Sequence, residues 1–337
     1  MIKYLLYPVS WFFAIIVYVR NKLYDWNMLP IINSKLPVIS VGNIEVGGTG
    51  KTPFVIALSK QLIKRDIKPV IITRGYKRNS KHQIIFNNLN QYSAQEVGDE
   101  PYYIKKILDS VPIIIDHNKK NAVKTTNQLS NIDCIILDDG FQSRYINRDL
   151  DIVLQSWQSK GQALGTALLP VGVWREPLSN VRRSDMFYGV CKEETLYAKY
   201  NDSATLQKLN RHPLRCKYEL HKYENNMLSV MDCLKINEPC VAFCGIAKPA
   251  SFIQTIKKYT SIDKEILFEN HAKYDTKKYA QLKNLNPNNL SFITTYKDFV
   301  KLNKTFKSTY TIYVLELNLI LDDDDLLNEI ENLVNEN

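Results

Sequence analysis

The chain has 337 residues, of which 45% are hydrophobic and 23% are charged, an ordinary balance for a globular protein. This composition excludes a largely disordered chain and a membrane protein of many spans, and the length favours two domains. The 44 basic and 35 acidic side chains give a net charge of +9, which suits nucleic acid, an anionic membrane surface or phosphorylated small molecules. A basic surface without a particular partner is the alternative. Six irregularly spaced cysteines without a CxxC pair favour free thiols in a reducing compartment.

The N-terminal segment 4–19 carries no charge, and basic residues follow it. As a helix at about 1.5 Å per residue it is too short for the roughly 30 Å core of a bilayer, and it lacks the cleavage site of a secretory signal. Ser10 is suited to cap a helix start, and Tyr24 and Trp26 are typical of a membrane interface. We therefore predict a membrane-associated helix within residues 1–30, in or dipping into the cytoplasmic leaflet; a buried helix is the alternative.

A phosphate-binding loop is indicated between an apolar segment, 36–41, and an amphipathic segment that begins near residue 53. The sequence between them is Gly-Gly-Thr-Gly-Lys-Thr, and a strand, such a turn and a helix are the context that this loop requires. Glycines let main-chain N–H groups close around phosphate oxygens. Lys51 is placed to reach the β- and γ-phosphates, and the Thr52 hydroxyl to bind Mg²⁺. Glu45 replaces the first glycine of the usual pattern, so a glycine-rich turn with an incidental lysine is the alternative.

A second buried strand, 131–137, ends in Asp138 and Asp139. Open α/β sheets bind their ligands at the carboxyl ends of the strands. Two adjacent carboxylates repel each other unless a cation or hydrogen bonds offset the repulsion. We therefore predict that one of the two binds Mg²⁺, directly or through water; a solvated acidic turn is the alternative.

The type of phosphate-loop protein is narrowed by missing motifs. The sequence has neither the N/T-K-x-D of GTPases, since 295–298 holds similar residues in another order, nor the LSGGQ of transport ATPases. A kinase or a less typical ATPase remains. Cations at 74–78, carboxylates at 99–100 and an Arg-Glu pair at 175–176 favour a small-molecule kinase. Each cluster alone is more often a capping acid or a surface ion pair.

The alternation of strands and helices over 37–190 is typical of a doubly wound parallel sheet. The mixed polar segment 211–223 is predicted to be a linker. We therefore expect a P-loop NTPase-like α/β domain at 31–210 and a second, smaller α/β domain at 224–337.

The chain carries an ordered set of motifs: VGN-x-x-VGGTGKTP, RGY-x-R, VGDEP, DDGFQ, LLP-x-G-x-x-REP, GIA-x-P and NH-x-x-Y. This set resembles the tetraacyldisaccharide 4'-kinase family, the lipid A 4'-kinases, up to about residue 300. The resemblance implies that ATP and Mg²⁺ are used to phosphorylate the 4'-hydroxyl of a tetraacylated glucosamine disaccharide 1-phosphate, giving lipid IVA. It also implies work at the cytoplasmic face of a bacterial inner membrane, without nucleic acid. A kinase for another membrane saccharide or isoprenoid lipid, and a nucleotide-switched membrane scaffold, remain alternatives.

The resemblance also implies roles for individual residues. Asp99 would be the base for the sugar hydroxyl, oriented and tuned by His271, although a lone histidine is more often structural. The implied ligands of the ATP phosphates are Gly47, Gly48, Thr49, Gly50, Lys51 and Thr52. The implied metal ligands are Thr52, Asp138 and Asp139. The implied substrate-binding residues are Arg74, Tyr76, Arg78, Glu100, Gln142, Arg175 and Glu176. The departures from the family pattern are Ser143, Val173, Trp174, Asn270 and Tyr296.

Overall fold

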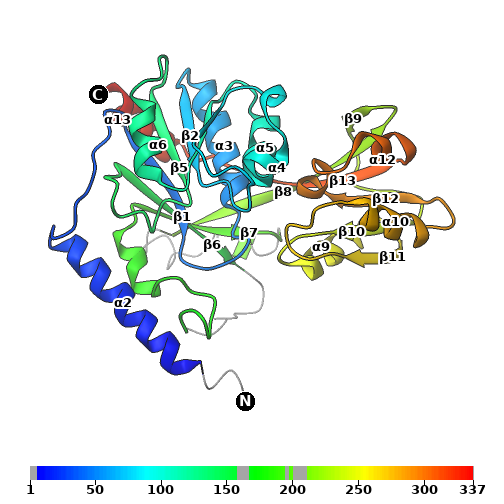
Figure 1. The fold of residues 1–337 in the computed structure, drawn as a ribbon, viewed down its shortest axis with the longest axis horizontal. Coiled ribbons are helices and arrows are strands. Elements are labelled where there is room, and N and C mark those ends of the chain that lie inside the picture. The colour runs from blue at the N-terminus through cyan, green and yellow to red at the C-terminus, as the bar shows by residue number, and fades with distance from the viewer. Residues whose placement is uncertain (1–5, 158–166, 194–196, 200–210, 337) are drawn as a thin grey trace.

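The computed structural model describes residues 6–157, 167–193, 197–199 and 211–336. Figure 1 shows two bodies joined by two long strands, β8 (Arg211–Glu224) and β13 (Ile312–Ile320). We name these bodies the first half, which contains β1 to β7, and the second half, which contains β9 to β12. One sheet runs through both, in the order β11-β10-β12-β13-β8-β7-β6-β1-β5-β2-β4-β3, with β9 paired to β8.

The first half is built on parallel strands, and only β3 runs antiparallel to its neighbour. Its strands are β1 (Val38–Asn43), β2 (Pro69–Thr73), β3 (Ile84–Phe86), β4 (Ile113–Ile115), β5 (Cys134–Asp138), β6 (Leu150–Trp157) and β7 (Met186–Cys191). Its helices are α3 (Lys51–Lys64), α4 (Ala94–Val97), α5 (Asp99–Ile107) and α6 (Lys119–Thr126), with short turns η1 (Leu89–Gln91) and η2 (Leu178–Arg183).

Both faces of this sheet are covered by helices, which is why its strands are mostly apolar and almost entirely buried. On β2, Ile71 shares a buried cluster with Phe54 of α3, whereas the next residue, Ile72, lies in another cluster with Val123 of α6. Successive side chains of a strand point to opposite faces, so the two clusters lie on opposite sides. The predicted doubly wound parallel sheet is confirmed.

The second half continues the sheet with parallel strands: β10 lies between β11 and β12, and β12 pairs with β13. Its strands are β9 (Met227–Val230), β10 (Cys240–Cys244), β11 (Ile262–Leu267) and β12 (Ser291–Thr295). Its helices are α9 (Pro249–Ile256), α10 (Thr276–Asn284), α11 (Tyr296–Phe299) and α12 (Lys304–Thr309). The six cysteines are free thiols.

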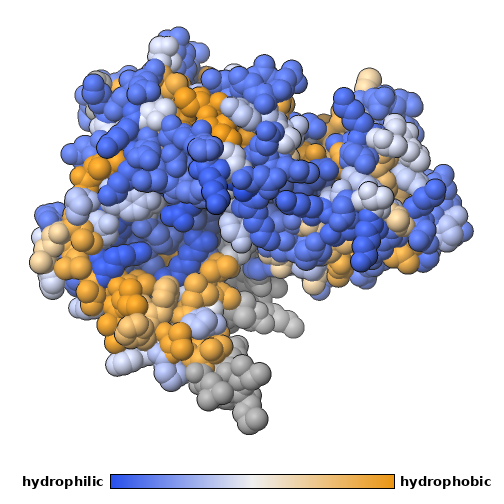
Figure 2. Space-filling model, viewed as in Figure 1, coloured by the Kyte–Doolittle hydropathy of each residue, from blue (hydrophilic) through white to orange (hydrophobic). Residues whose placement is uncertain are grey.

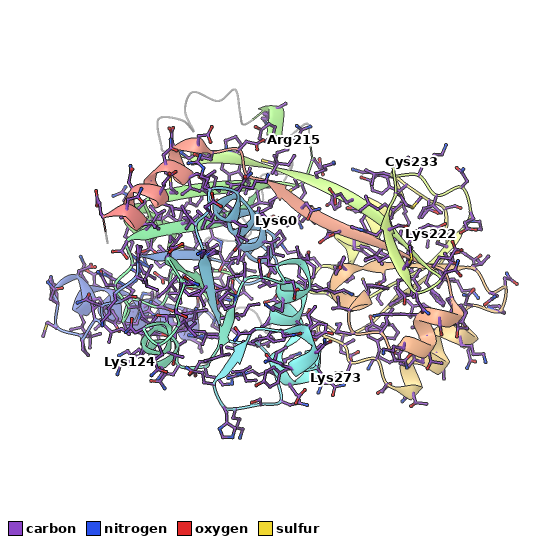
Figure 3. All side chains as sticks on the ribbon, turned by 90° about the horizontal axis from the view of Figure 1, so that it is seen from above. Lys60, Lys124, Arg215, Lys222, Cys233 and Lys273 are labelled. Atoms are coloured by element: carbon purple, nitrogen blue, oxygen red, sulfur yellow. The ribbon has the colours of Figure 1, made fainter. Side chains whose placement is uncertain are left out.

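The segment 211–223, predicted to be a linker, forms nearly all of β8 instead. Its first residues pair with β7 and the rest with β13, antiparallel, so β8 belongs to both halves. Figure 3 shows the same course from above, with the labelled Arg215 over the first half and Lys222 over the second. Apolar residues such as the buried Leu214 and Leu220 alternate with charged ones, which is the pattern of a strand with one buried face, so the linker prediction is wrong.

The last helix, α13 (Asp324–Asn335), returns to the first half, although residues 224–337 were expected to form one smaller domain (Figure 1). Arg65 of α3 lies 2.9 Å from Asp324, and the Tyr188 hydroxyl donates a hydrogen bond of 2.6 Å to Asp323. The reason is the length of β13, which carries the chain back alongside β8.

The N-terminal helix α2 (Tyr7–Asp25) stands out at the lower left of Figure 1. It begins before Ser10, because Pro8 fits the first turn of a helix, and the Ser10 hydroxyl instead donates to the Leu168 carbonyl oxygen. Most of its apolar residues are exposed, among them Trp11, which is 70% exposed. Figure 2 shows an apolar surface at this place. The alternative of a buried helix is therefore wrong. No helix in the described ranges is long and apolar enough to span a bilayer.

Candidate active site

The glycine-rich loop connects β1 to α3, as the sequence predicts. Gly47 and Gly50 have φ angles of +123° and +92°, a region that only glycine adopts readily. No described atom lies within 4 Å of the position that a Cβ would take at Gly48. The Asn43 amide, at the end of β1, donates a hydrogen bond of 2.8 Å to the Thr49 hydroxyl and so fixes the loop to the sheet.

Glu45, which departs from the usual phosphate-loop pattern, contacts Trp174, which departs from the family pattern, at the start of this loop. Glu45 forms an antiparallel bridge with Trp174, and its carboxylate accepts a hydrogen bond of 3.1 Å from the main-chain N–H of Ser156. The glutamate thus fastens the loop to β6, a contact that glycine lacks.

Asp139 lies between two cations at the end of β5. The ammonium of Lys51 lies 3.3 Å from one carboxylate oxygen, and the guanidinium of Arg175 lies 2.9 Å from the other. Burial raises the pKa of Asp139, but these two cations outweigh it and hold the pKa well below its ordinary value. The side chain is therefore ionised, and its charge is balanced by the protein itself.

Asp138, the preceding residue, is buried without a cation at its carboxylate among the described residues. The only hydrogen bond that this carboxylate accepts from the described residues comes from the Thr73 hydroxyl, at 2.9 Å. Burial, with the negative charges of Glu100 and Asp139, raises the pKa of Asp138 to about 6. A divalent cation would remove this repulsion, and carboxylate oxygens are ligands that Mg²⁺ prefers. The nearby Thr52 is also buried. These residues fit a bound Mg²⁺.

Lys119 of α6 holds the main chain of both aspartates in place, a role that sequence reasoning did not indicate. Its buried ammonium donates hydrogen bonds to the main-chain oxygens of Asp138 (2.5 Å) and Asp139 (2.7 Å). Burial lowers the pKa of Lys119 to about 8. No motif surrounds it, so only the fold brings it to the end of β5.

Asp99 and His271 meet between the halves, as the motif comparison implied. Asp99 begins α5 of the first half, and His271 follows β11 of the second; Asp99 Oδ2 and His271 Nδ1 lie 3.3 Å apart. Lys301 lies 3.5 Å from the same oxygen. Burial raises the pKa of Asp99, but the contacts with His271 and Lys301 prevail and lower it below its ordinary value.

The backbone of His271 is held in an unusual conformation. Its φ angle is +61°, and its N–H donates a hydrogen bond of 2.9 Å to Gly245. Such conformations are costly away from glycine and often mark functional sites. The ring of Tyr76, from the first half, lies edge-on at 5.3 Å.

Other contacts also join the halves around this pair. Glu100 forms a close ion pair with Lys297, and the Lys77 ammonium donates to the main-chain oxygen of Asn270 at 3.2 Å. Glu100 therefore takes part in holding the halves together.

The remaining predicted substrate-binding residues differ in their exposure and in their hydrogen bonds to the protein. Arg74 and Tyr76 are exposed. Arg78 is buried and donates to the Ile115 carbonyl oxygen, and Gln142 donates to that of Asn43. Arg78 and Gln142 thus brace the loops of the site.

Glu176 lies at the base of the N-terminal helix, which differs from the expectation that it binds substrate. Its carboxylate is fully buried and accepts hydrogen bonds from Arg20 and Asn21 of α2 and from Asn180 and Arg183. Two of these four partners lie in α2, so the carboxylate anchors this helix, and no local pattern indicates the partner Asn21, 155 residues away.

Lys248 approaches the phosphate loop from the second half, and sequence reasoning did not single it out. Its Cε lies 3.8 Å from the position that a Cβ would take at Gly47. It occupies the variable position of GIA-x-P, so the motif gives it no role.

The comparisons with known proteins show the family of the chain. The model of the family described as "LpxK: Tetraacyldisaccharide-1-P 4'-kinase" matches residues 2–335. The chain belongs to this family. It is 33% identical to the tetraacyldisaccharide 4'-kinase of Aquifex aeolicus over 90% of each chain. It is 30% identical to that of Bacteroides thetaiotaomicron over 88% of this chain and 82% of the relative.

A solved structure gives the same result. The crystal structure of LpxK from Aquifex aeolicus in complex with ATP covers 99% of this chain and 99% of its own, with a TM-score of 0.77 and 27% identity. As a member of this family, the protein is an ATP-dependent kinase of lipid A biosynthesis.

Proposed function

We propose that this kinase transfers the γ-phosphoryl group of ATP to the 4'-hydroxyl of tetraacyldisaccharide 1-phosphate and so produces lipid IVA. The observation that carries the proposal is the contact of Asp99 with His271, from opposite halves, together with the loop that holds Lys51. A carboxylate, an imidazole and a phosphate-loop lysine are the groups that phosphoryl transfer to a hydroxyl requires.

Asp99 is the base. Its lowered pKa keeps the carboxylate ionised at neutral pH, ready to accept the proton that leaves the attacking sugar hydroxyl. His271 and Lys301 orient the carboxylate through the same oxygen, Oδ2. The other oxygen, Oδ1, is then the one that faces the acceptor.

The phosphates of ATP bind to the main chain of residues 47–52 and to Lys51. That ammonium is held by Asp139 in the present structure and turns to the β- and γ-phosphates when ATP binds. Thr52 and Asp138 would hold Mg²⁺, which would supply positive charge to neutralise the phosphates. Arg175 stays on Asp139 and keeps that carboxylate paired when Lys51 leaves.

The acceptor is a lipid, so the enzyme must work at a membrane surface. The exposed apolar side of α2 fits the cytoplasmic face of a bacterial inner membrane, where the helix lies in the outermost part of the leaflet. Tyr76 is exposed and lies against the ring of His271, and Arg74 is exposed two residues before it; both bind the polar head of the lipid.

The test is to incubate the purified protein with ATP, Mg²⁺ and the disaccharide 1-phosphate and to measure the mass of the lipid product. We expect one added phosphate and one ADP per lipid. The proposed acceptor would be contradicted if the disaccharide lipid stayed unmodified and ATP were consumed only with another saccharide or isoprenoid lipid. Nucleotide binding without any turnover would indicate a scaffold.

A further inference from the structure

We propose that Lys248 binds the γ-phosphate of ATP and stabilises it during transfer, as a cation supplied by the second half to the loop of the first. The inference rests on the proposed function and adds a residue to which the family motif gives no role. Lys51, within the loop, binds the β- and γ-phosphates in the proposed function. The two lysines would therefore contact the γ-phosphate from opposite halves.

The position of Lys248 is the first argument. Its Cε is the only described atom within 4 Å of the place where a side chain would begin at Gly47, and no described atom lies so close at Gly48. The glycines therefore leave the surface of the loop open for phosphate, and the lysine side chain lies at its edge. A flexible ammonium at this distance needs only a rotamer change to reach an anion on the loop.

The support of Lys248 is the second argument. Lys248 lies three residues after Gly245 in the same turn. The N–H of Gly245 donates a hydrogen bond of 3.0 Å to the Asp298 carboxylate, and its carbonyl oxygen accepts one of 2.9 Å from the N–H of His271. Asp298 in turn lies 3.0 Å from Lys301, which contacts Asp99. One turn thus places both the imidazole at the base and the ammonium at the loop.

The charge around Lys248 is the third argument. The side chain is exposed and has no ion pair or hydrogen bond to the residues that the structure describes. Its positive charge acts on Lys192, which directly follows β7. Burial lowers the pKa of Lys192, and the charge of Lys248 lowers it further. Two neighbouring cations favour a bound anion.

The chemistry follows from this arrangement. The sugar oxygen forms a bond to the γ-phosphorus, the bond from that phosphorus to the bridging oxygen of ADP breaks, and the hydroxyl proton passes to Asp99. Lys248 stays protonated and donates hydrogen bonds to the non-bridging γ-oxygens. The negative charge of the transferring group is spread over these oxygens in the transition state.

The test compares Lys248→Met and Lys248→Arg with the wild type and with Lys258→Met, which removes an exposed lysine just beyond the end of α9. We expect Lys248→Met to lower kcat by about 100-fold with little change in the KM of the lipid. Lys248→Arg should restore much of the rate, and Lys258→Met should match the wild type. Equal kcat values for Lys248→Met and Lys258→Met would overturn the proposal.

A binding measurement keeps the inference separate from the identity of the acceptor. The wild type should bind a non-hydrolysable ATP analogue more tightly than ADP in the presence of Mg²⁺, and Lys248→Met should lose most of this difference while binding ADP normally. If the variant keeps the full preference for the analogue, Lys248 does not contact the γ-phosphate. An inactive wild type that shows the preference would refute the proposed acceptor and leave the role of Lys248 standing.

Discussion

His271 Nδ1 lies 3.3 Å from Asp99 Oδ2, although the two residues are 172 positions apart and belong to different halves of the molecule. The carboxylate begins α5 on the first half, and the imidazole follows β11 on the second. Any motion of the halves relative to each other therefore changes the surroundings of the proposed base. Activity should depend on this contact in ways that pH and mutation reveal.

The pH dependence of the reaction tests the effect of His271 on Asp99. The structure lowers the pKa of Asp99, so the ionised form persists to lower pH and activity falls only when pH drops through this lowered value. His271→Ala removes one of the contacts that lower the pKa. The acidic limb of kcat/KM should then move to higher pH, in addition to a lower plateau. An unchanged limb would mean that another group controls it.

Asp99→Ala should lower kcat strongly and leave the KM of ATP nearly unchanged, because the carboxylate acts on the acceptor hydroxyl and not on the nucleotide. Initial rates at varied ATP concentration measure both constants. A rise in the KM of ATP alone would make Asp99 a nucleotide ligand.

Lys51→Ala should lower kinase activity by about 100-fold or more, because it removes a positive charge that stabilises the transferring phosphoryl group. Lys60→Ala is the matched control, since this exposed lysine lies farther along the same helix, α3. The rate of product formation should be about 100-fold or more lower in Lys51→Ala than in Lys60→Ala. Turnover near that of the wild type in Lys51→Ala would contradict the assignment of the loop.

Removal of divalent metal tests the site at the end of β5. A chelator should abolish turnover, and added Mg²⁺ should restore it. Asp138→Asn should raise the Mg²⁺ concentration needed for half-maximal rate by about 10-fold or more, because a neutral amide is a weaker ligand. The same Mg²⁺ dependence in the variant and the wild type would leave Asp138 without a part in metal binding.

Glu176→Gln should destabilise the protein by about 3 kcal/mol, because it leaves the partly buried Arg20 and Arg183 without their counter-charge. Glu331→Gln, which removes an exposed partner of Arg65, should cost less than about 1 kcal/mol. Denaturant unfolding of both variants provides the comparison. Equal losses would show that the anchor of α2 contributes no more than a surface ion pair.

Deletion of residues 1–28 should release the protein from membranes, since the exposed apolar residues of α2 are then lost. Flotation with vesicles of anionic phospholipid measures the bound fraction. Partitioning that survives the deletion would place the membrane contact elsewhere on the chain.

Local patterns in the sequence determined much of the first half. The buried strands that end at the glycine-rich loop and at Asp138 are visible as apolar runs, since a strand covered on both faces is mostly apolar. The loop itself is visible because its glycines and lysine are adjacent in the chain. These elements depend on neighbours in sequence, which is the range that a pattern covers.

The tertiary structure alone decided how the parts meet. The strand β8 pairs with strands of both halves, and α13 returned to the first half because β13 is long enough to carry it there. Glu176 became an anchor for α2, and Lys248 came to the edge of the loop, through contacts between distant segments. Such contacts leave no local pattern, because the partners are brought together by the packing of the sheet and not by their spacing along the chain.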